Sequence, residues 1–200
     1  MVINNFPKTI NWCWFGLTEM SDQTKLCIES WKEHMPDWEI KCWDSTILKN
    51  APKFVSDAMN DGNFGFASDW ARVYIIYKYG GIYLDSDIFL YKSLEDLCNY
   101  PSWFVKMNSD MVSSEVFGGI KNNFIFFEIL KYYMISDYKK AKISPIVFGN
   151  VISKCNNSEI IENSCNHGIK IYPKTYGSNK GGIYFKHLSL KEWIKKKKSE

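Results

Sequence analysis

Two carboxylates only two residues apart are the side chains of this sequence best suited to chemistry. Asp85 and Asp87 directly follow the apolar run Gly80–Leu84. Such a pair can converge on one hard cation, Mg²⁺ or Mn²⁺, which keeps some waters and takes substrate phosphates as further ligands. A cation held this way can neutralise a departing diphosphate. The pair therefore points to an enzyme that handles a nucleotide diphosphate, although a polar turn after a strand has the same letters.

The elements around the pair favour a site over a simple turn. Apolar side chains recur at helical spacing between residues 66 and 77, which predicts an amphipathic helix. Gly80 and Gly81 would end this helix, because glycine tolerates the left-handed conformation of a helix stop. Asp69 and Arg72, three residues apart, share one face near its start, where an ordinary surface ion pair is the alternative. The strand that follows would deliver its acids to the sheet edge, where ligands bind in open α/β sheets.

The order of these residues resembles a known family. Ser68-Asp69-x-x-Arg72 and then Tyr-Gly-Gly-Ile-Tyr-Leu-Asp-Ser-Asp over 79–87 are similar to the signature of glycosyltransferases with a DXD sugar-binding region. This glycosyltransferase family 32-like group includes bacterial capsular-polysaccharide transferases and fungal initiating α-1,6-mannosyltransferases. The glucosylating domains of large clostridial toxins share the same core pattern.

Further blocks along the chain extend the resemblance. Residues 6–16, with the letters FPKTINWCWFG, are similar to the family's opening "IPKxIHxxWFG". Residues 27–32 and 36–40 resemble its next two blocks. Residues 184–187 together with Trp193 resemble a degraded form of its closing "HHxxxSW". The resemblance is strong over residues 6–97 and patchy beyond them.

An α/β architecture follows from both the residues and the resemblance. Strands predicted over 10–15 and 39–43 flank a helix predicted over 22–34, and this alternation favours parallel pairing. The resemblance implies a glycosyltransferase A-type nucleotide-binding fold, with a mixed, mainly parallel sheet flanked by helices. We expect one domain over 1–200, with a nucleotide-sugar-binding half (1–97) and an acceptor-side half with a C-terminal tail (98–200). Later apolar runs predict helices over 51–62, 124–134 and 145–153 and strands over 102–107, 115–120, 168–172 and 182–185.

The resemblance implies metal ligands for a Mn²⁺ or Mg²⁺ cofactor. Asp87 would bind the cation directly, and Asp85 would serve its water shell or contact the donor sugar and ribose. His187 is a further candidate ligand near the C-terminal end. The sequence departs from the closing motif here, because Leu188 replaces its second His and Glu192 replaces its Ser. The third ligand is therefore open between the histidine and the glutamate.

The resemblance also implies contacts to the nucleotide sugar. Asp69 would accept hydrogen bonds from sugar hydroxyls, and Arg72 would hold the sugar or the phosphates, which suits its planar fork. Trp14 would stack on the nucleotide base, although an aromatic residue at a strand end is often plain core. Ser68 would contact base or ribose, and Trp193 would lie over the diphosphate.

Composition and charge bear on the partners and the cellular compartment that we expect. The 200 residues are 46% hydrophobic and 16% aromatic, which is ample for one core, and the net charge of +3 argues neither for nor against nucleic acid. We expect no nucleic-acid partner, no signal peptide before Pro7 and no membrane-spanning stretch. A cytoplasmic protein with reduced thiols is therefore expected. Lys195–Lys198 is a candidate for peripheral contact with the inner membrane face, against the alternative of a solvated tail.

The sequence thus predicts a metal-dependent retaining glycosyltransferase. It would move a hexose from a nucleotide diphosphate sugar to a glycan or lipid-linked hydroxyl. A UDP-sugar is the first choice and GDP-mannose the second, and the resemblance implies bacterial surface polysaccharide or capsule synthesis. Two alternatives remain open: a metal-dependent nucleotide-sugar hydrolase, and a non-catalytic nucleotide-sugar-binding protein of the same fold.

Overall fold

A seven-stranded sheet forms the centre of the computed structural model, which describes residues 5–15, 19–156, 160–162 and 164–190. Its order is β2-β1-β3-β6-β5-β8-β7. The strands are β1 (Thr9–Cys13), β2 (Glu39–Trp43), β3 (Gly81–Leu84), β5 (Ser102–Lys106), β6 (Val112–Gly119), β7 (Cys165–Asn166) and β8 (Ile169–Tyr172). A second, three-stranded sheet has the order β4-β10-β9, with β4 (Ile88–Leu90), β9 (Gly177–Ser178) and β10 (Phe185–His187).

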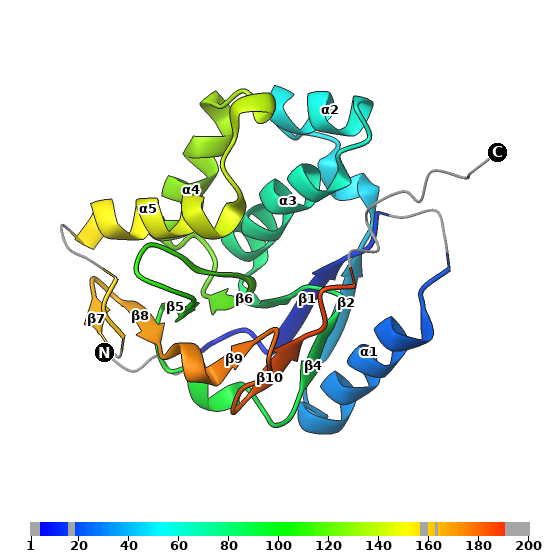
Figure 1. Cartoon of the computed structure of the whole chain (residues 1–200), viewed down its shortest axis with the longest axis vertical. Coiled ribbons are helices and arrows are strands. Elements are labelled where there is room, and N and C mark those ends of the chain that lie inside the picture. The colour runs from blue at the N-terminus through cyan, green and yellow to red at the C-terminus, as the bar shows by residue number, and fades with distance from the viewer. Residues whose placement is uncertain (1–4, 16–18, 157–159, 163, 191–200) are drawn as a thin grey trace.

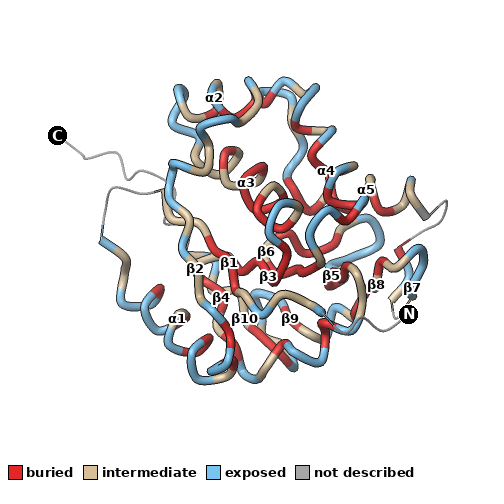
Figure 2. Tube along the Cα trace, turned by 180° about the vertical axis from the view of Figure 1, so that it is seen from behind, coloured by how far each residue is buried: buried red, intermediate tan, exposed pale blue. Residues whose placement is uncertain are grey.

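Helices cover both faces of the large sheet (Figure 1). On one side lie α2 (Lys53–Asn60), α3 (Phe64–Tyr79), α4 (Phe124–Ile135) and α5 (Ser144–Asn156). On the other side lie α1 (Asp22–His34) and the small sheet. Strand alternation supplies both cores, since Tyr83 packs with the α2–α5 layer while its neighbours Ile82 and Leu84 pack on the α1 side. Figure 2 shows the result, with buried chain concentrated along the central strands and the inner sides of the helices.

The sheet is mixed but mainly parallel in direction, as predicted. β1 pairs in parallel with β2 and β3, and β5 pairs in parallel with β8. Strand β6 lies antiparallel between β3 and β5, so the five strands β2, β1, β3, β5 and β8 run the same way. Because β3 (Gly81–Leu84) pairs with Val116–Gly119 of β6, one sheet joins the early and the late part of the chain.

Several short features differ from the sequence prediction, and two of them bear on the site. The strand predicted over 182–185 begins only at Phe185, because Ile183 and Tyr184 donate instead to the carbonyls of Thr175 and Tyr176 in a preceding 3₁₀ turn. The three-residue strand β4 was not predicted, since so short a run has no readable alternation. It pairs antiparallel with β10.

The helix that leads into the acidic strand ends as predicted. α3 stops at Tyr79, and Gly80 follows with φ of +74° while its N–H donates to the Ile76 carbonyl. Gly81 also has a positive φ, +98°, and a Cβ there would lie 2.4 Å from the Thr9 carbonyl oxygen. These two glycines let the chain turn from α3 straight into a strand that lies against β1.

No helix within the described residues is both long and apolar enough to cross a bilayer.

Candidate functional site

The acid pair lies in a tight turn between the two sheets. Asp85 follows β3, and its backbone N–H donates to the Glu115 carbonyl of β6 (2.9 Å). The Ile88 N–H donates to the Asp85 carbonyl (3.1 Å), which closes the turn and starts β4. Asp87 thus stands at the junction where the chain leaves the large sheet for the small one.

The small sheet brings His187 to the acids. Antiparallel pairing sets His187 opposite Ile88, and its Nε2 lies 3.3 Å from Asp87 Oδ1. The segment after β10 also contacts Asp87. The Leu188 N–H donates to the backbone carbonyl of Asp87 (2.9 Å), and the Leu190 N–H donates to Asp87 Oδ2 (2.8 Å). The predicted late ligand therefore does lie beside the acids, while Glu192 lies outside the described residues.

These three side chains can hold a divalent cation. One potential ligand atom from each of Asp85, Asp87 and His187 lies within 4.8 Å of the others. Neighbouring ligands of an octahedral ion with bonds near 2.1 Å stand about 3 Å apart, so small side-chain movements suffice. Two carboxylates suit Mg²⁺ or Mn²⁺, and an imidazole nitrogen is a ligand that Mn²⁺ accepts more readily than Mg²⁺. The donor set leaves room for oxygen ligands from a substrate.

Arg72 is buried between two carboxylates. Its guanidinium lies 3.3 Å from Asp69 and 3.3 Å from Asp85, and also donates to the Ser114 carbonyl (2.9 Å). It further donates to the carbonyl and the hydroxyl of Ser68 (both 3.3 Å). Asp69 and Arg72 share one helical face, as predicted, and their ion pair is enclosed within the fold, unlike an ordinary surface pair. The arginine thus fixes both acids relative to α3 and β6.

Two serines complete the site in a way that the sequence did not indicate. The Ser144 hydroxyl at the start of α5 donates to Asp69 Oδ1 (2.8 Å) and lies 3.0 Å from the Ser114 hydroxyl of β6. Tyr83 donates from its hydroxyl to Asp85 Oδ1 (3.0 Å). Serines are common and follow no motif here, so only the tertiary packing of α5 and β6 against α3 reveals them.

Burial and neighbouring charges together raise the pKa values of Asp85 and His187 and lower that of Asp87. Burial raises the pKa of Asp85 to about 7, repulsion from Asp87 and Glu115 adds to this, and Arg72 opposes it. Burial alone would raise the pKa of Asp87, but His187 and the Leu190 N–H together hold it below its usual value. Burial would lower the pKa of His187, yet its hydrogen bond and attraction to Asp87 raise it. An Asp85 that binds a proton near neutrality will release it to solvent when a cation binds.

The remaining predicted contacts lie nearby or outside the described residues. Ser68 lies beside the guanidinium of Arg72, as described above. Trp14 follows the end of β1, is half-buried, and packs near Trp12 with ring centroids 6.4 Å apart. Its neighbour Trp12 is buried in the core. Stacking of Trp14 on a base remains a prediction, and Trp193 and Lys195–Lys198 lie outside the described residues.

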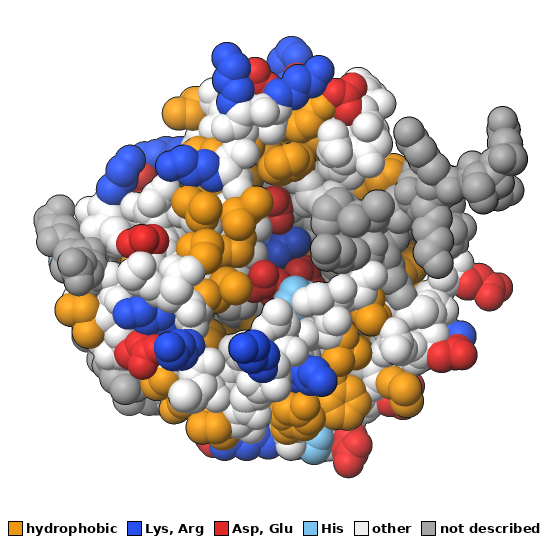
Figure 3. Space-filling model, viewed as in Figure 1, with side chains coloured by type: hydrophobic (Ala, Val, Ile, Leu, Met, Phe, Trp, Pro, Cys, Tyr) orange, Lys and Arg blue, Asp and Glu red, His pale blue; other side chains and the backbone are white. Residues whose placement is uncertain are grey.

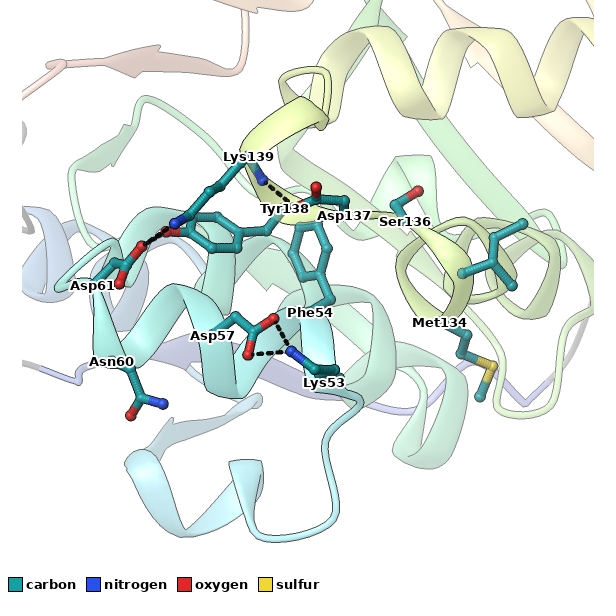
Figure 4. A pocket seen from close by; sticks show the side chains of 11 residues that line it. Lys53, Phe54, Asp57, Asn60, Asp61, Met134, Ser136, Asp137, Tyr138 and Lys139 are labelled. Carbon is teal, nitrogen blue, oxygen red and sulfur yellow. Dashed lines mark hydrogen bonds and ion pairs between the residues drawn. The ribbon is translucent and has the colours of Figure 1, made fainter.

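The site opens on one face of the molecule. Figure 3 shows acidic, basic and histidine side chains gathered in a hollow at the centre of this face, with hydrophobic side chains along one side. A separate depression of about 660 Å³ lies between α2 and the segment that follows α4. Two ion pairs lie on its walls, Lys53 with Asp57 and Lys139 with Asp61 (Figure 4), and among the described residues Asp137 there accepts only the backbone N–H of Lys139. The chemistry-bearing side chains therefore belong to the first hollow.

The chain is similar to known glycosyltransferase sequences over the stretch that contains the acid pair. Residues 21–109 match the family model described as "Glycosyltransferase sugar-binding region containing DXD motif". The chain is similar to inositol phosphoceramide mannosyltransferase 3 of Schizosaccharomyces pombe, with 26% identity over 130 residues. It is also similar to inositol phosphoceramide mannosyltransferase 2 of the same yeast, with 27% identity over 133 residues. Each alignment covers 62% of this chain but only 36% and 37% of the relatives, so the chain spans little more than a third of their length.

Solved structures share the fold. The glycosyltransferase PaToxG superposes with a TM-score of 0.64 at 19% identity, covering 74% of this chain and 68% of its own. A glycosyltransferase involved in glycosylation of the major capsid of PBCV-1 superposes with a TM-score of 0.57 at 12% identity, covering 90% and 93%. Residues 21–109 are thus similar to a DXD-containing glycosyltransferase sugar-binding region, and the whole fold is shared with solved glycosyltransferases.

Proposed function

We propose that this chain is a metal-dependent glycosyltransferase that moves a hexose from a nucleotide diphosphate sugar to a hydroxyl of a glycan or lipid-linked acceptor. The observation that carries the proposal is the convergence of Asp85, Asp87 and His187 within 4.8 Å, beside a buried carboxylate–arginine pair. A sugar diphosphate needs cationic help at its phosphates and hydrogen-bond acceptors at its hydroxyls. This hollow offers both.

We assign each residue of the hollow a role that fits its charge and its position. A cation on Asp85, Asp87 and His187 would neutralise the departing diphosphate. Asp69 accepts hydrogen bonds from sugar hydroxyls, since Ser144 and Arg72 already fix its orientation. Arg72 keeps Asp69 and Asp85 in place and adds positive charge near the developing anion. We propose retention of configuration, the outcome that the family resemblance implies.

The identities of the sugar donor and of the acceptor are also proposals. The names of the two yeast relatives favour mannose as the sugar and a ceramide-based lipid as the acceptor. The resemblance of the motifs favours a UDP-sugar, so UDP-sugars and GDP-mannose are the donors to compare. Because these relatives are fungal, a part in bacterial capsule synthesis stays a prediction from the motifs alone.

Calorimetry on Asp87→Asn tests the proposal. Wild type should bind UDP or GDP in the presence of Mn²⁺, and the variant should lose the Mn²⁺-dependent part while keeping its melting behaviour. Asp57→Asn is the control, because Asp57 also has a basic partner, Lys53, but lies outside the hollow. Nucleotide binding by Asp87→Asn equal to wild type would place the site elsewhere.

A labelled donor then separates transfer from the two alternatives. Transfer of the label to an added glycan or glycolipid acceptor supports the proposal. Release of free sugar without transfer under all acceptor conditions makes the chain a hydrolase. Tight binding with no turnover makes it a binding protein, and either of these results overturns the proposed transfer.

A further inference from the structure

Strand β6 carries a bulge next to the hollow. Phe104 of β5 pairs with Phe117 of β6, but Lys106, two residues further along β5, pairs with Val112. Four residues of β6 (113–116) therefore lie opposite a single residue of β5. A bulge turns side chains out of the regular alternation of a strand, and bulges are frequent next to active sites. The side chains of this part of β6 thus need not alternate between the two faces of the sheet.

Glu115 is fixed in the bulge through only one of its two carboxylate oxygens. Its Oε2 accepts from the Ser113 hydroxyl (2.8 Å) and from the Ser114 N–H (3.1 Å). Its backbone carbonyl accepts the Asp85 N–H (2.9 Å), so the residue lies directly beside the acid pair. Oε1 has no hydrogen-bond or ion-pair partner among the described residues. This half-buried side chain therefore keeps one oxygen free for a ligand.

The charge of Glu115 acts on side chains all around the hollow of Figure 3. Burial is the main cause that raises the pKa values of Asp69 and Asp85, and Glu115 raises both further. Burial lowers the pKa of His187, the contact with Asp87 raises it by more, and Glu115 adds to the rise. Electrostatic interaction weakens with distance, so one charge that affects all three groups lies close to each of them. Glu115 is thus a fourth acid of the hollow.

The three aspartates of the hollow are already engaged. Asp69 and Asp85 lie beside Arg72. Asp85 and Asp87 also belong to the group that can hold a cation, and among the described residues Glu115 does not. An ionised carboxylate accepts hydrogen bonds and cannot donate them, so the free oxygen of Glu115 suits a hydroxyl group of a ligand. Glu115 therefore offers an oxygen that neither the arginine nor the cation requires.

We infer that the free carboxylate oxygen of Glu115 accepts a hydrogen bond from the acceptor hydroxyl that receives the sugar. In the sheet, β1, which Trp14 follows, lies beside β3, which the acid pair follows, and β6 is the next strand beyond β3. The inference rests on the proposed function, in which the donor runs from Trp14 over the cation, so that its sugar end approaches β6. A hydroxyl held there by Glu115 is oriented for attack on the sugar.

Transfer kinetics of Glu115→Gln test the inference. The amide oxygen of the variant keeps the hydrogen bonds of Oε2, while its NH₂ group replaces Oε1 and cannot accept from a hydroxyl. GDP-mannose and UDP-glucose serve as donors at saturating Mn²⁺, and methyl α-mannoside, octyl β-glucoside and glucosylceramide serve as acceptors. The acceptor KM should rise roughly tenfold to a hundredfold, as expected for one hydrogen bond to a charged group. The donor KM and the kcat at saturating acceptor should stay nearly unchanged, because the bond is made before and during the reaction alike.

Donor hydrolysis in the same reactions provides a second readout. Water does not need the hydrogen bond that captures the acceptor, so free sugar should still be released by Glu115→Gln. At a fixed acceptor concentration, the ratio of transferred to released sugar should therefore fall by the same factor as the acceptor affinity. A general loss of stability would lower both products together.

Glu162→Gln is the matched control. Glu162 is also half-buried, and its Oε1 accepts the Lys174 N–H (3.2 Å). Lys174 follows β8, which lies two strands from β6 in the sheet. This variant should match wild type in donor KM, acceptor KM and kcat.

The alternatives for Glu115 give different results. A Mn²⁺ affinity that falls as far as in Asp87→Asn would make Glu115 a cation ligand and overturn the inference. A raised donor KM with an unchanged acceptor KM would place Glu115 at the donor sugar and overturn it as well. Equal acceptor KM values in wild type and Glu115→Gln would overturn this inference alone. Wild type that transfers sugar to none of the three acceptors would overturn the proposed function, and the inference with it.

Discussion

At the scale of single residues, the site is a chain of alternating charges. Arg72 lies between Asp69 and Asp85, and His187 lies against Asp87. Each buried charge thus has a partner of opposite sign, which offsets the cost of removing it from water. Such an arrangement keeps the acids in fixed places before any ligand binds. Preorganised charges stabilise a transition state most effectively, because they need not rearrange during the reaction.

Ser144→Ala should impair sugar transfer more than nucleotide binding. The substitution removes the hydrogen bond to Asp69, and a bond to a charged group contributes about 1.5–3 kcal/mol. We therefore expect kcat to fall by roughly tenfold to a hundredfold, with the affinity for the nucleoside diphosphate unchanged and Ser144→Thr largely restoring activity. Steady-state kinetics and calorimetry on the same variant measure both quantities.

Ser113→Ala provides the matched control for this prediction. It removes a serine–carboxylate hydrogen bond that is likewise partly buried and of the same 2.8 Å length, from Ser113 to Glu115. A similar loss of kcat in both variants would mean that the effect is general destabilisation. A loss of nucleotide affinity in Ser144→Ala would move Asp69 from the sugar to the nucleotide.

The stability of the metal-free protein should fall as the pH rises through about 7. Asp85 has a folded pKa of about 7 against an ordinary 3.8, so it binds its proton more tightly when folded, and this stabilisation is complete only at acid pH. The raised pKa of His187 acts in the same direction above its ordinary 6.5. The lowered pKa of Asp87 matters only when the pH falls through values below 3.8. Melting scans across this range should show the decline, and Asp85→Asn should flatten it.

Cation binding should have the opposite pH dependence. Mn²⁺ must displace the protons on Asp85 and His187, so its affinity should rise with pH by up to about tenfold per unit for each proton displaced. Calorimetry in two buffers of different ionisation enthalpy counts the protons released. Binding that releases no proton near neutrality would show that Asp85 is already ionised without the cation.

At the scale of elements, sequence reasoning succeeded where the site is local. Ser68, Asp69 and Arg72 lie on α3, and Asp85 and Asp87 follow the next strand, so one helix–turn–strand unit carries them all. The helical spacing, the glycine stop and the apolar strand are each determined by near neighbours along the chain. These are the features that periodicity and turn chemistry predict well.

Sequence reasoning failed where the site depends on distant contacts. Ser114 reaches Arg72 only because β6 inserts antiparallel beside β3, and Ser144 reaches Asp69 only because α5 packs on that strand. His187 was named from a degraded motif, but its place beside Asp87 depends on β4 and β10, each only three residues long. Short strands have too few residues to show a pattern, so their pairing is set by packing alone.

Gly81→Ala should destabilise the fold severely and disturb the acid pair. The new Cβ would lie 2.4 Å from the Thr9 carbonyl oxygen, in a residue with φ of +98°, so β3 would have to move away from β1. We expect a loss on the order of 3 kcal/mol or more in the free energy of unfolding. Urea denaturation measures it, and reduced Mn²⁺ affinity should accompany it because Asp85 follows the displaced strand.

Gly62→Ala separates the two causes of this loss. Gly62 also has a positive φ, +74°, but a Cβ there meets nothing within 4 Å. Only the backbone penalty of about 1–2 kcal/mol should therefore remain. Equal losses in the two variants would show that the contact between β3 and β1 relaxes freely.

At the scale of the whole molecule, each of the two sheets contributes a different part of the site. The large sheet and the α2–α5 layer hold Asp69, Arg72 and Asp85. The small sheet supplies His187, and the segment after it supplies the backbone N–H groups that hydrogen-bond to Asp87. The hollow in Figure 3 therefore lies where two separately packed layers meet. An ion in that place would contact both of them.

Such an ion would act as a staple between distant parts of the chain. Leu190 and Asp87, which hydrogen-bond beside it, are 103 residues apart in sequence. Contacts between residues so far apart tend to form late in folding. Mn²⁺ should therefore slow unfolding while leaving the refolding rate nearly unchanged, because it strengthens contacts that the transition state still lacks. Stopped-flow denaturant jumps with and without Mn²⁺ measure both rates, and faster refolding would mean that the last strand docks early.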